Sequence, residues 1–173
     1  MRRPCANLKR PGSDAVTARL NWPSLLLGVF ALLFDRGHKF IQLDVLGGVV
    51  GGPVPLLPII DYTYVENTGV SYNLFSELPV WALAGLAAVA VAGMLVWWWR
   101  SADPLVRTGL MLIIGGALSN AIDRMVYGGV ADFFRLHWGD MSFFVFNIAD
   151  VAISAGVVLL AADVLGFGRP KSS

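Results

Sequence analysis

The chain has 173 residues, of which 56% are hydrophobic and only 14% are charged, and its mean hydropathy is +0.65. This composition is too apolar for a water-soluble domain and predicts a small integral membrane protein. The net charge of +1 argues against a nucleic-acid partner, and the single cysteine excludes an internal disulfide. No Cys/His cluster has metal-ligand spacing, which argues against a metal or other cofactor.

Residues 1–21 form a basic tail that we expect on the cytoplasmic side. No small-x-small cleavage site follows the first apolar run, so that run predicts an uncleaved span from Trp22 to about Ile41. At its far end Asp35 and Lys39 stand four residues apart, acid first, which favours a helical ion pair. An equally good alternative is that they only end the span near the headgroups, with Lys39 reaching toward water.

Residues 44–78 contain no Lys or Arg, and the Gly and Pro residues of their first half exclude a continuous helix there. Within them, Ile60–Val65 is rich in β-branched and aromatic residues, and Asn67-Thr68-Gly69 supplies turn residues after it. We therefore expect an outer β segment at about residues 43–78.

Three further apolar runs predict spans at Pro79–Trp99, about Leu105–Tyr127 and about Phe143–Phe167. We expect residues 128–142, between the last two of these spans, to form a loop. The expected fold class is thus membrane all-α, with four transmembrane helices within residues 22–167, a small extracytoplasmic β element, and a short cytoplasmic tail at residues 168–173.

The distribution of basic residues orients these spans. Both tails and the turn between the second and third spans are basic, whereas residues 42–79 carry only acids, so both termini should be cytoplasmic. The polar ends of the first, third and fourth spans then meet at the outer side of the membrane. A helical rise of 1.5 Å per residue places Asp150 roughly 10 Å below Phe143 at that side.

Two stretches, Asn120–Arg124 and Phe146–Asp150, each place an amide three residues before a carboxylate, so that both side chains share a helix face. Polar groups near lipid are costly unless they face an interior or water, and they mark a functional site. Arg124 could hold Asp123 or orient a bound carbonyl, and the sequence does not choose between these roles.

Asp132 lies between the two stretches, and with Asp150 it could form a pair of acids that shares one proton. Such a pair can activate water and protonate a leaving amine. Intramembrane acids also suit a proton-coupled transporter, or a structural protein with buried ion pairs, and their spacing alone leaves these alternatives open.

Three segments resemble the signature segments of signal peptidase II, the bacterial lipoprotein signal peptidase: Gly115–Arg124, Val130–Phe133 and Phe146–Asp150. Two shorter segments add to the resemblance: Phe34-Asp35-Arg36 with Lys39, and Asn67-Thr68-Gly69. The matches follow the family's order over roughly residues 30–160, and together they are highly specific.

The resemblance implies an aspartic endopeptidase of the bacterial inner membrane that needs no metal. It would remove the signal peptide from diacylglyceryl-modified prolipoproteins, on the amino side of the lipidated cysteine, at an active site near the periplasmic face. Asp132 and Asp150 match the family's catalytic pair, and its β-cradle corresponds to Tyr62–Asn67. The positions that match substrate-binding or supporting residues are Asn67, Gly69, Asn120, Asp123, Arg124, Asn147, Asp35 and Lys39. We expect a monomer in contact with membrane lipid.

The chain departs from the family's usual residues at a few positions. Arg36 replaces a glutamine beside the first aspartate, Ser119 replaces a glycine before Asn120, and Val70-Ser71-Tyr72 replaces a small-small-aromatic stretch. These departures bear on substrate contacts more than on catalysis.

Overall fold

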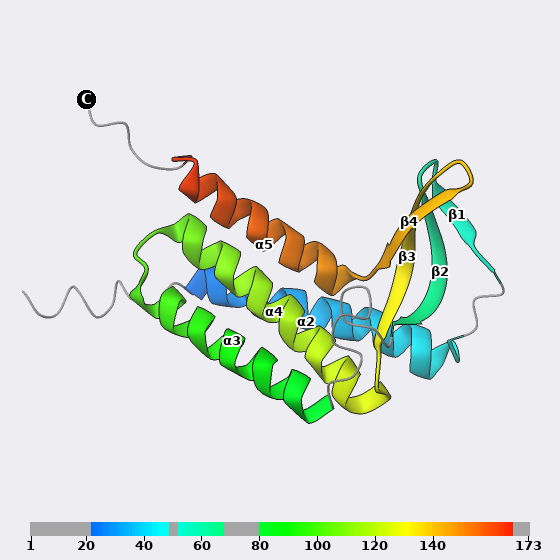
Figure 1. Cartoon of the computed structure of the whole chain (residues 1–173), viewed down its shortest axis with the longest axis horizontal. Helices are drawn as coiled ribbons and strands as arrows, with labels where there is room; N and C mark the ends of the chain where they lie inside the picture. The colour runs from blue at the N-terminus through cyan, green and yellow to red at the C-terminus, as the bar shows by residue number, and fades with distance from the viewer. Residues whose placement is uncertain (1–21, 49–51, 68–79, 168–173) are drawn as a thin grey trace, which may run out of the picture.

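The computed structural model describes residues 22–48, 52–67 and 80–167, which form a helical bundle with a sheet at one end (Figure 1). The helices are α2 (Trp22–Phe40), α3 (Val80–Arg100), α4 (Pro104–Tyr127) and α5 (Ile148–Val164), and a π-helical segment η1 (Ile41–Val45) continues α2. The strands are β1 (Val54–Leu57), β2 (Ile60–Asn67), β3 (Val130–Trp138) and β4 (Met141–Phe146), antiparallel in the order β1-β2-β3-β4. Both predicted tails and the expected turn at Thr68-Gly69 lie outside the described residues.

The central helix is α4, which packs against α2, α3 and α5. It begins after Asp103, whose carboxylate accepts the N–H of Leu105 at 2.7 Å, and it ends at Gly128 in the left-handed conformation. A Cβ at Gly115 would lie 2.2 Å from the carbonyl oxygen of Gly28 in α2, and one at Gly116 would lie 2.5 Å from that of Ala149 in α5. These glycines therefore let both neighbouring helices approach the backbone of α4 closely at its polar end.

Among the described residues, α4 is the one helix that is long and apolar enough to cross a membrane, and α3 contributes a shorter apolar stretch from Gly85 to Arg100. The predicted arrangement of four spans stays a prediction.

The sheet is larger than the predicted β element. β2 confirms the strand expected at Ile60–Val65. The prediction of a loop over residues 128–142 is wrong, because most of that segment forms β3, a turn at Gly139 with φ of +53°, and the start of β4. Its charges had suggested a loop, yet Arg135 pairs across the sheet with Asp61, its Nε lying 3.1 Å from Asp61 Oδ2. The described part of the chain is accordingly not all-α.

The last helix also begins later than predicted, at Ile148 rather than near Phe143. Residues 141–146 pair with β3 instead. Aromatic and β-branched residues, which are common in strands, make up most of this run. Asp150 therefore lies in the first turn of α5, and the helix that the predicted depth counts from Phe143 begins only at Ile148.

Aromatic rings join the sheet to the end of α2. The ring of His38 lies 4.9 Å from that of Phe133 and 5.7 Å from that of Phe134, measured between centroids. The hydroxyl of Tyr62 on β2 lies 3.3 Å from His38 Nε2. Phe133 is fully buried in this layer. The contact fixes β3 against α2, and with it the neighbouring Asp132.

Candidate active site

The polar end of α2 points into the protein. Lys39 Nζ lies 2.7 Å from Asp35 Oδ2 and 2.6 Å from Asp123 Oδ2 of α4, and the side chains of all three residues are 0% exposed. The ion pair predicted from the four-residue spacing is confirmed, and its burial excludes the alternative in which Lys39 reaches toward headgroups. We refer to Asp35, Lys39 and Asp123 as the charge frame.

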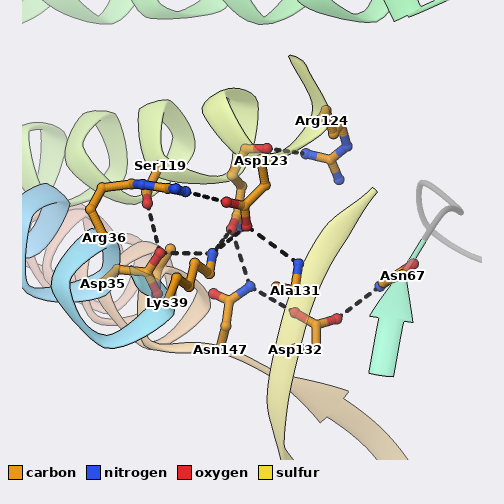
Figure 2. A network of polar contacts seen from close by, with 12 residues as sticks. Asp35, Arg36, Lys39, Asn67, Ser119, Asp123, Arg124, Ala131, Asp132 and Asn147 are labelled. Atoms are coloured by element: carbon orange, nitrogen blue, oxygen red, sulfur yellow. Dashed lines mark hydrogen bonds and ion pairs between the residues drawn. The ribbon is translucent and has the colours of Figure 1, made fainter. Parts of the chain in front are cut away.

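The two carboxylates of the charge frame also hold backbone N–H groups (Figure 2). Asp123 Oδ2 accepts the N–H of Ala131, the residue before one candidate acid, at 3.3 Å. Asp35 Oδ1 accepts the N–H of Ala149, the residue before the other candidate acid, at 2.9 Å. Because Lys39 binds both carboxylates, the charge frame links the backbone positions of both candidate acids.

Amide side chains link the two candidate acids directly. Asn120 Nδ2 donates to Asp150 Oδ1 at 2.8 Å, while Asn147 Nδ2 donates to Asp132 Oδ1 at 2.7 Å and to Asn120 Oδ1 at 3.1 Å. On the far side Asn67 Nδ2 donates to Asp132 Oδ2 at 3.0 Å (Figure 2). Five predicted site residues, from β2, α4, β3 and the start of α5, thus form one continuous chain of hydrogen bonds.

The prediction that Asn147 and Asp150 share a helix face is wrong, because Asn147 is the extended N-cap residue of α5. Its Oδ1 accepts the N–H of Asp150 at 2.9 Å, and Asp150 Oδ2 accepts the N–H of Asn147 at 3.2 Å, which completes a capping box. The cap uses the oxygen of the Asn147 amide, so its nitrogen can donate to Asp132.

Asp132 is 2% exposed, and this burial raises its pKa to about 6. The hydrogen bonds from Asn67 and Asn147 and the charge of Lys39 lower its pKa, while the negative charge of Asp150 raises it. A carboxyl group with such a pKa can hold a proton next to a second, ionised carboxylate. The arrangement can therefore carry out general acid-base chemistry.

Arg124 does not hold Asp123, which was one of the two roles that the sequence left open for it. Its Nη1 donates to the backbone carbonyl of Asn120 at 3.3 Å. The role of holding Asp123 belongs to Lys39 and Arg36, both of which form ion pairs with it. Gly69, the remaining predicted site residue, lies outside the described residues.

Arg36 and Ser119 are two contributors to this region that were not predicted as site residues. Arg36 Nη1 pairs with Asp123 Oδ1, and Ser119 Oγ donates to Asp35 Oδ2 at 2.6 Å. The spacing held a signal for one of them, because Arg36 stands three residues before Lys39 and so shares its helix face.

The fold matches that of solved membrane enzymes. One structure, described as "Bacterial membrane enzyme structure by the in meso method at 2.3 A resolution", has a TM-score of 0.76 at 24% sequence identity and covers 89% of this chain and 94% of its own. A second, at 1.9 Å, has a TM-score of 0.73 at 24% identity over 84% and 94%. The bundle with its antiparallel sheet is thus the fold of a bacterial membrane enzyme.

Sequence comparisons identify the family. The family model described as Signal peptidase (SPase) II matches residues 27–166. A lipoprotein signal peptidase of Methylorubrum extorquens is 48% identical over 145 residues, covering 80% of this chain and 85% of the relative. One of Methylocella silvestris is 44% identical over 147 residues, covering 83% and 86%. The chain belongs to the signal peptidase II family, a family of proteases, and the resemblance stated from its motifs is confirmed.

Proposed function

We propose that the chain is an aspartic endopeptidase that cleaves the signal peptide from diacylglyceryl-modified prolipoproteins, on the amino side of the lipidated cysteine. Family membership supports the protease activity, and the shared name of the relatives, lipoprotein signal peptidase, supports the substrate class. One observation carries the mechanism: the side-chain amides of Asn147 and Asn120 connect Asp132 on a strand to Asp150 on a helix through continuous hydrogen bonds.

In the proposed reaction one of these acids holds a proton and the other is ionised. The ionised acid takes a proton from a water molecule, whose oxygen attacks the scissile carbonyl carbon. The C–N bond then breaks, and the protonated acid transfers its proton to the leaving nitrogen. The pKa of Asp132, about 6 beside the charge of Asp150, supports one shared proton.

The other predicted residues take two kinds of role. The amides of Asn67, Asn120 and Asn147 orient the catalytic acids, because each donates to one of them. Arg124 is half-buried at the edge of the site and uses Nη1 for a backbone carbonyl. The other N–H groups of its guanidinium suit it to orient the peptide or to stabilise the developing oxyanion.

We place the site at the outer side of the bacterial inner membrane, with four spans and both termini in the cytoplasm. The surface of the bundle supports contact with lipid. Leu26, Phe30 and Leu33 on α2 are 63%, 62% and 62% exposed, and Val158 on α5 is 65% exposed. Prolipoproteins and membrane lipid are the expected partners of a monomeric enzyme.

The test is cleavage of a purified diacylated prolipoprotein, with the unlipidated precursor measured in parallel and a chelator present. Asp132→Asn and Asp150→Asn should each abolish cleavage, because neither amide can exchange the shared proton. Asp140→Asn, in the exposed turn between β3 and β4, is the matched control and should retain activity. Undiminished turnover in either catalytic variant would exclude the assignment. A pH-driven flux in proteoliposomes that is lost in Asp150→Asn would support the transporter alternative instead.

A further inference from the structure

The carboxylate of Asp123 has a donor for each oxygen. Oδ1 pairs with the guanidinium of Arg36, and Oδ2 accepts from Lys39 Nζ at 2.6 Å and from the N–H of Ala131 at 3.3 Å. A carboxylate held on both oxygens cannot turn without breaking an ion pair. Arg36 therefore fixes the oxygen that holds the backbone just before Asp132.

The carboxylate of Asp35 is held in the same way. Oδ2 accepts from Ser119 Oγ at 2.6 Å and from Lys39 Nζ at 2.7 Å, which leaves Oδ1 to accept the N–H of Ala149 at 2.9 Å. Ser119 is fully buried, as is Asp35, so water does not replace its hydroxyl group. Ser119 thus fixes the oxygen that holds the backbone just before Asp150.

We propose that Arg36 and Ser119 are positioning residues of this active site. Each one fixes a carboxylate of the charge frame and, through that carboxylate, the backbone N–H that precedes a catalytic acid. The inference rests on the proposed function and deepens it. It concerns two of the positions at which the chain departs from the family's usual residues, so it assigns them to catalytic geometry rather than to substrate contacts.

Arg36 has a second effect, through its charge. The charge frame alone contains two carboxylates and one ammonium group. The guanidinium of Arg36 brings the net charge of the group to zero. Without Arg36 an uncompensated negative charge remains beside the catalytic acids, and negative charge favours their protonated forms. Both limbs of the pH profile should then move to higher pH. The charged or titratable groups around Arg36 and the catalytic acids Asp132 and Asp150 are those of the charge frame, Arg124, Tyr64 and His38, which faces Asp35 and Lys39.

Three substitutions of Arg36 separate its hydrogen bond from its charge. Arg36→Met removes both, Arg36→Gln keeps an N–H donor, and Arg36→Lys keeps the charge. We expect Arg36→Met to lower kcat about tenfold or more, because small misplacements of catalytic groups are costly, with KM within about twofold. Both limbs of the pH profile should shift up by about half a unit or more in the Met and Gln variants. The Lys variant should keep the wild-type profile.

Ser119→Ala tests the other positioning residue without a change in charge. We expect kcat to fall about threefold to tenfold, the range for loss of one typical hydrogen bond, with an unchanged pH profile. Matched controls are Ser154→Ala, on the exposed face of α5, and Arg100→Met, at the exposed end of α3. Both should retain wild-type kcat and the wild-type pH profile.

The outcomes distinguish this inference from the proposed function. If the wild-type protein cleaves and Asp132→Asn does not, while the Arg36 and Ser119 variants keep the wild-type kcat and pH profile, the positioning roles are wrong and the proposed function stands. Loss of folded protein without a change in kcat or pH profile would also overturn them. If Arg36→Met does not accumulate in membranes, the comparison of Arg36→Gln with Arg36→Lys decides. If the wild-type protein does not cleave, both proposals fall.

Discussion

Two buried polar clusters lie at opposite ends of the bundle, and they are built differently. At the sheet end, the charge frame buries an ammonium between two carboxylates, all 0% exposed. At the other end, Trp98 Nε1 donates to Ser24 Oγ at 3.0 Å, and the guanidinium of Arg107 lies 5.6 Å from the centroid of the Trp98 ring.

The two clusters differ in what their buried polar groups hold. The Trp98 cluster connects α2, α3 and α4 through a neutral hydrogen bond and a cation–π contact, within a hydrophobic cluster that packs the same helices together. The charge frame does more, because each carboxylate also orients a backbone N–H next to a proposed catalytic acid. Charges that bind several donors at once fix geometry more strictly than one neutral bond, at a larger cost of burial.

Lys39→Met should have the largest effect on both stability and activity, because Lys39 is the shared cation of the charge frame. It leaves Asp35 and Asp123 buried without their shared cation, which costs about 3–5 kcal/mol of folding stability. We expect cleavage to fall by about a hundredfold or more, since the backbone before both acids loses its support. Turnover and thermal unfolding in detergent measure the two effects. A second substitution, Asp123→Asn, should recover part of the stability but not the activity. Retention of a tenth of the wild-type turnover by Lys39→Met would contradict this role.

Asn67→Leu should have an intermediate effect, at the catalytic acids themselves. The hydrogen bond from Asn67 lowers the pKa of Asp132, so its loss should raise that pKa above about 6. The proton that the pair shares leaves as pH rises through this pKa, so the alkaline limb of kcat/KM should move to higher pH. We expect kcat to fall about tenfold, which corresponds to about 1.4 kcal/mol and lies within the range for one hydrogen bond. Measured pH profiles of the two proteins decide, and a limb displaced downward would exclude this role of Asn67.

The smallest effect on activity is expected at the opposite end of the bundle. Trp98→Phe removes the donor to Ser24 while keeping an aromatic ring beneath Arg107. We expect a loss of about 1 kcal/mol in stability, as for one buried hydrogen bond, and wild-type kcat with an unchanged pH profile. Thermal unfolding and the cleavage assay measure these. A changed pH profile in Trp98→Phe would show that the two ends of the bundle are coupled, and it would contradict a purely structural role for the Trp98 cluster.

Much of the fold could be predicted from the sequence. The apolar runs predicted helix limits at Trp22, about Leu105 and about Tyr127, close to those found, and the strand at Ile60–Val65 was predicted from its composition. The prediction lacks β3 because the charged residues of 128–142 indicate a loop, and it lacks β4 because the apolar run that begins near Phe143 indicates a helix. Arg135 is compatible with a strand only because Asp61 lies opposite it in β2, which is a long-range fact.

The candidate site divides in the same way. Motif resemblance identified the acids and amides, and the four-residue spacing predicted the pair of Asp35 and Lys39. The sequence did not reveal that Asn147 both caps α5 and binds Asp132, since that depends on where β4 ends. Nor did it reveal the roles of Arg36 and Ser119, because their partners lie 87 and 84 residues away in the chain.

By itself, the sequence determined where the chain is apolar, which helices end in polar groups, and which side chains can exchange protons, because these properties depend on neighbours within a few turns of chain. Which of these groups come into contact depends on how the helices and strands pack. Asp35 reaches the N–H of Ala149, 114 residues further on, because glycines let α2 and α5 approach the backbone of α4. Asp132 reaches Asn147 because β3 pairs with β4. Such distances are set by packing and strand register, which no local pattern of residues encodes.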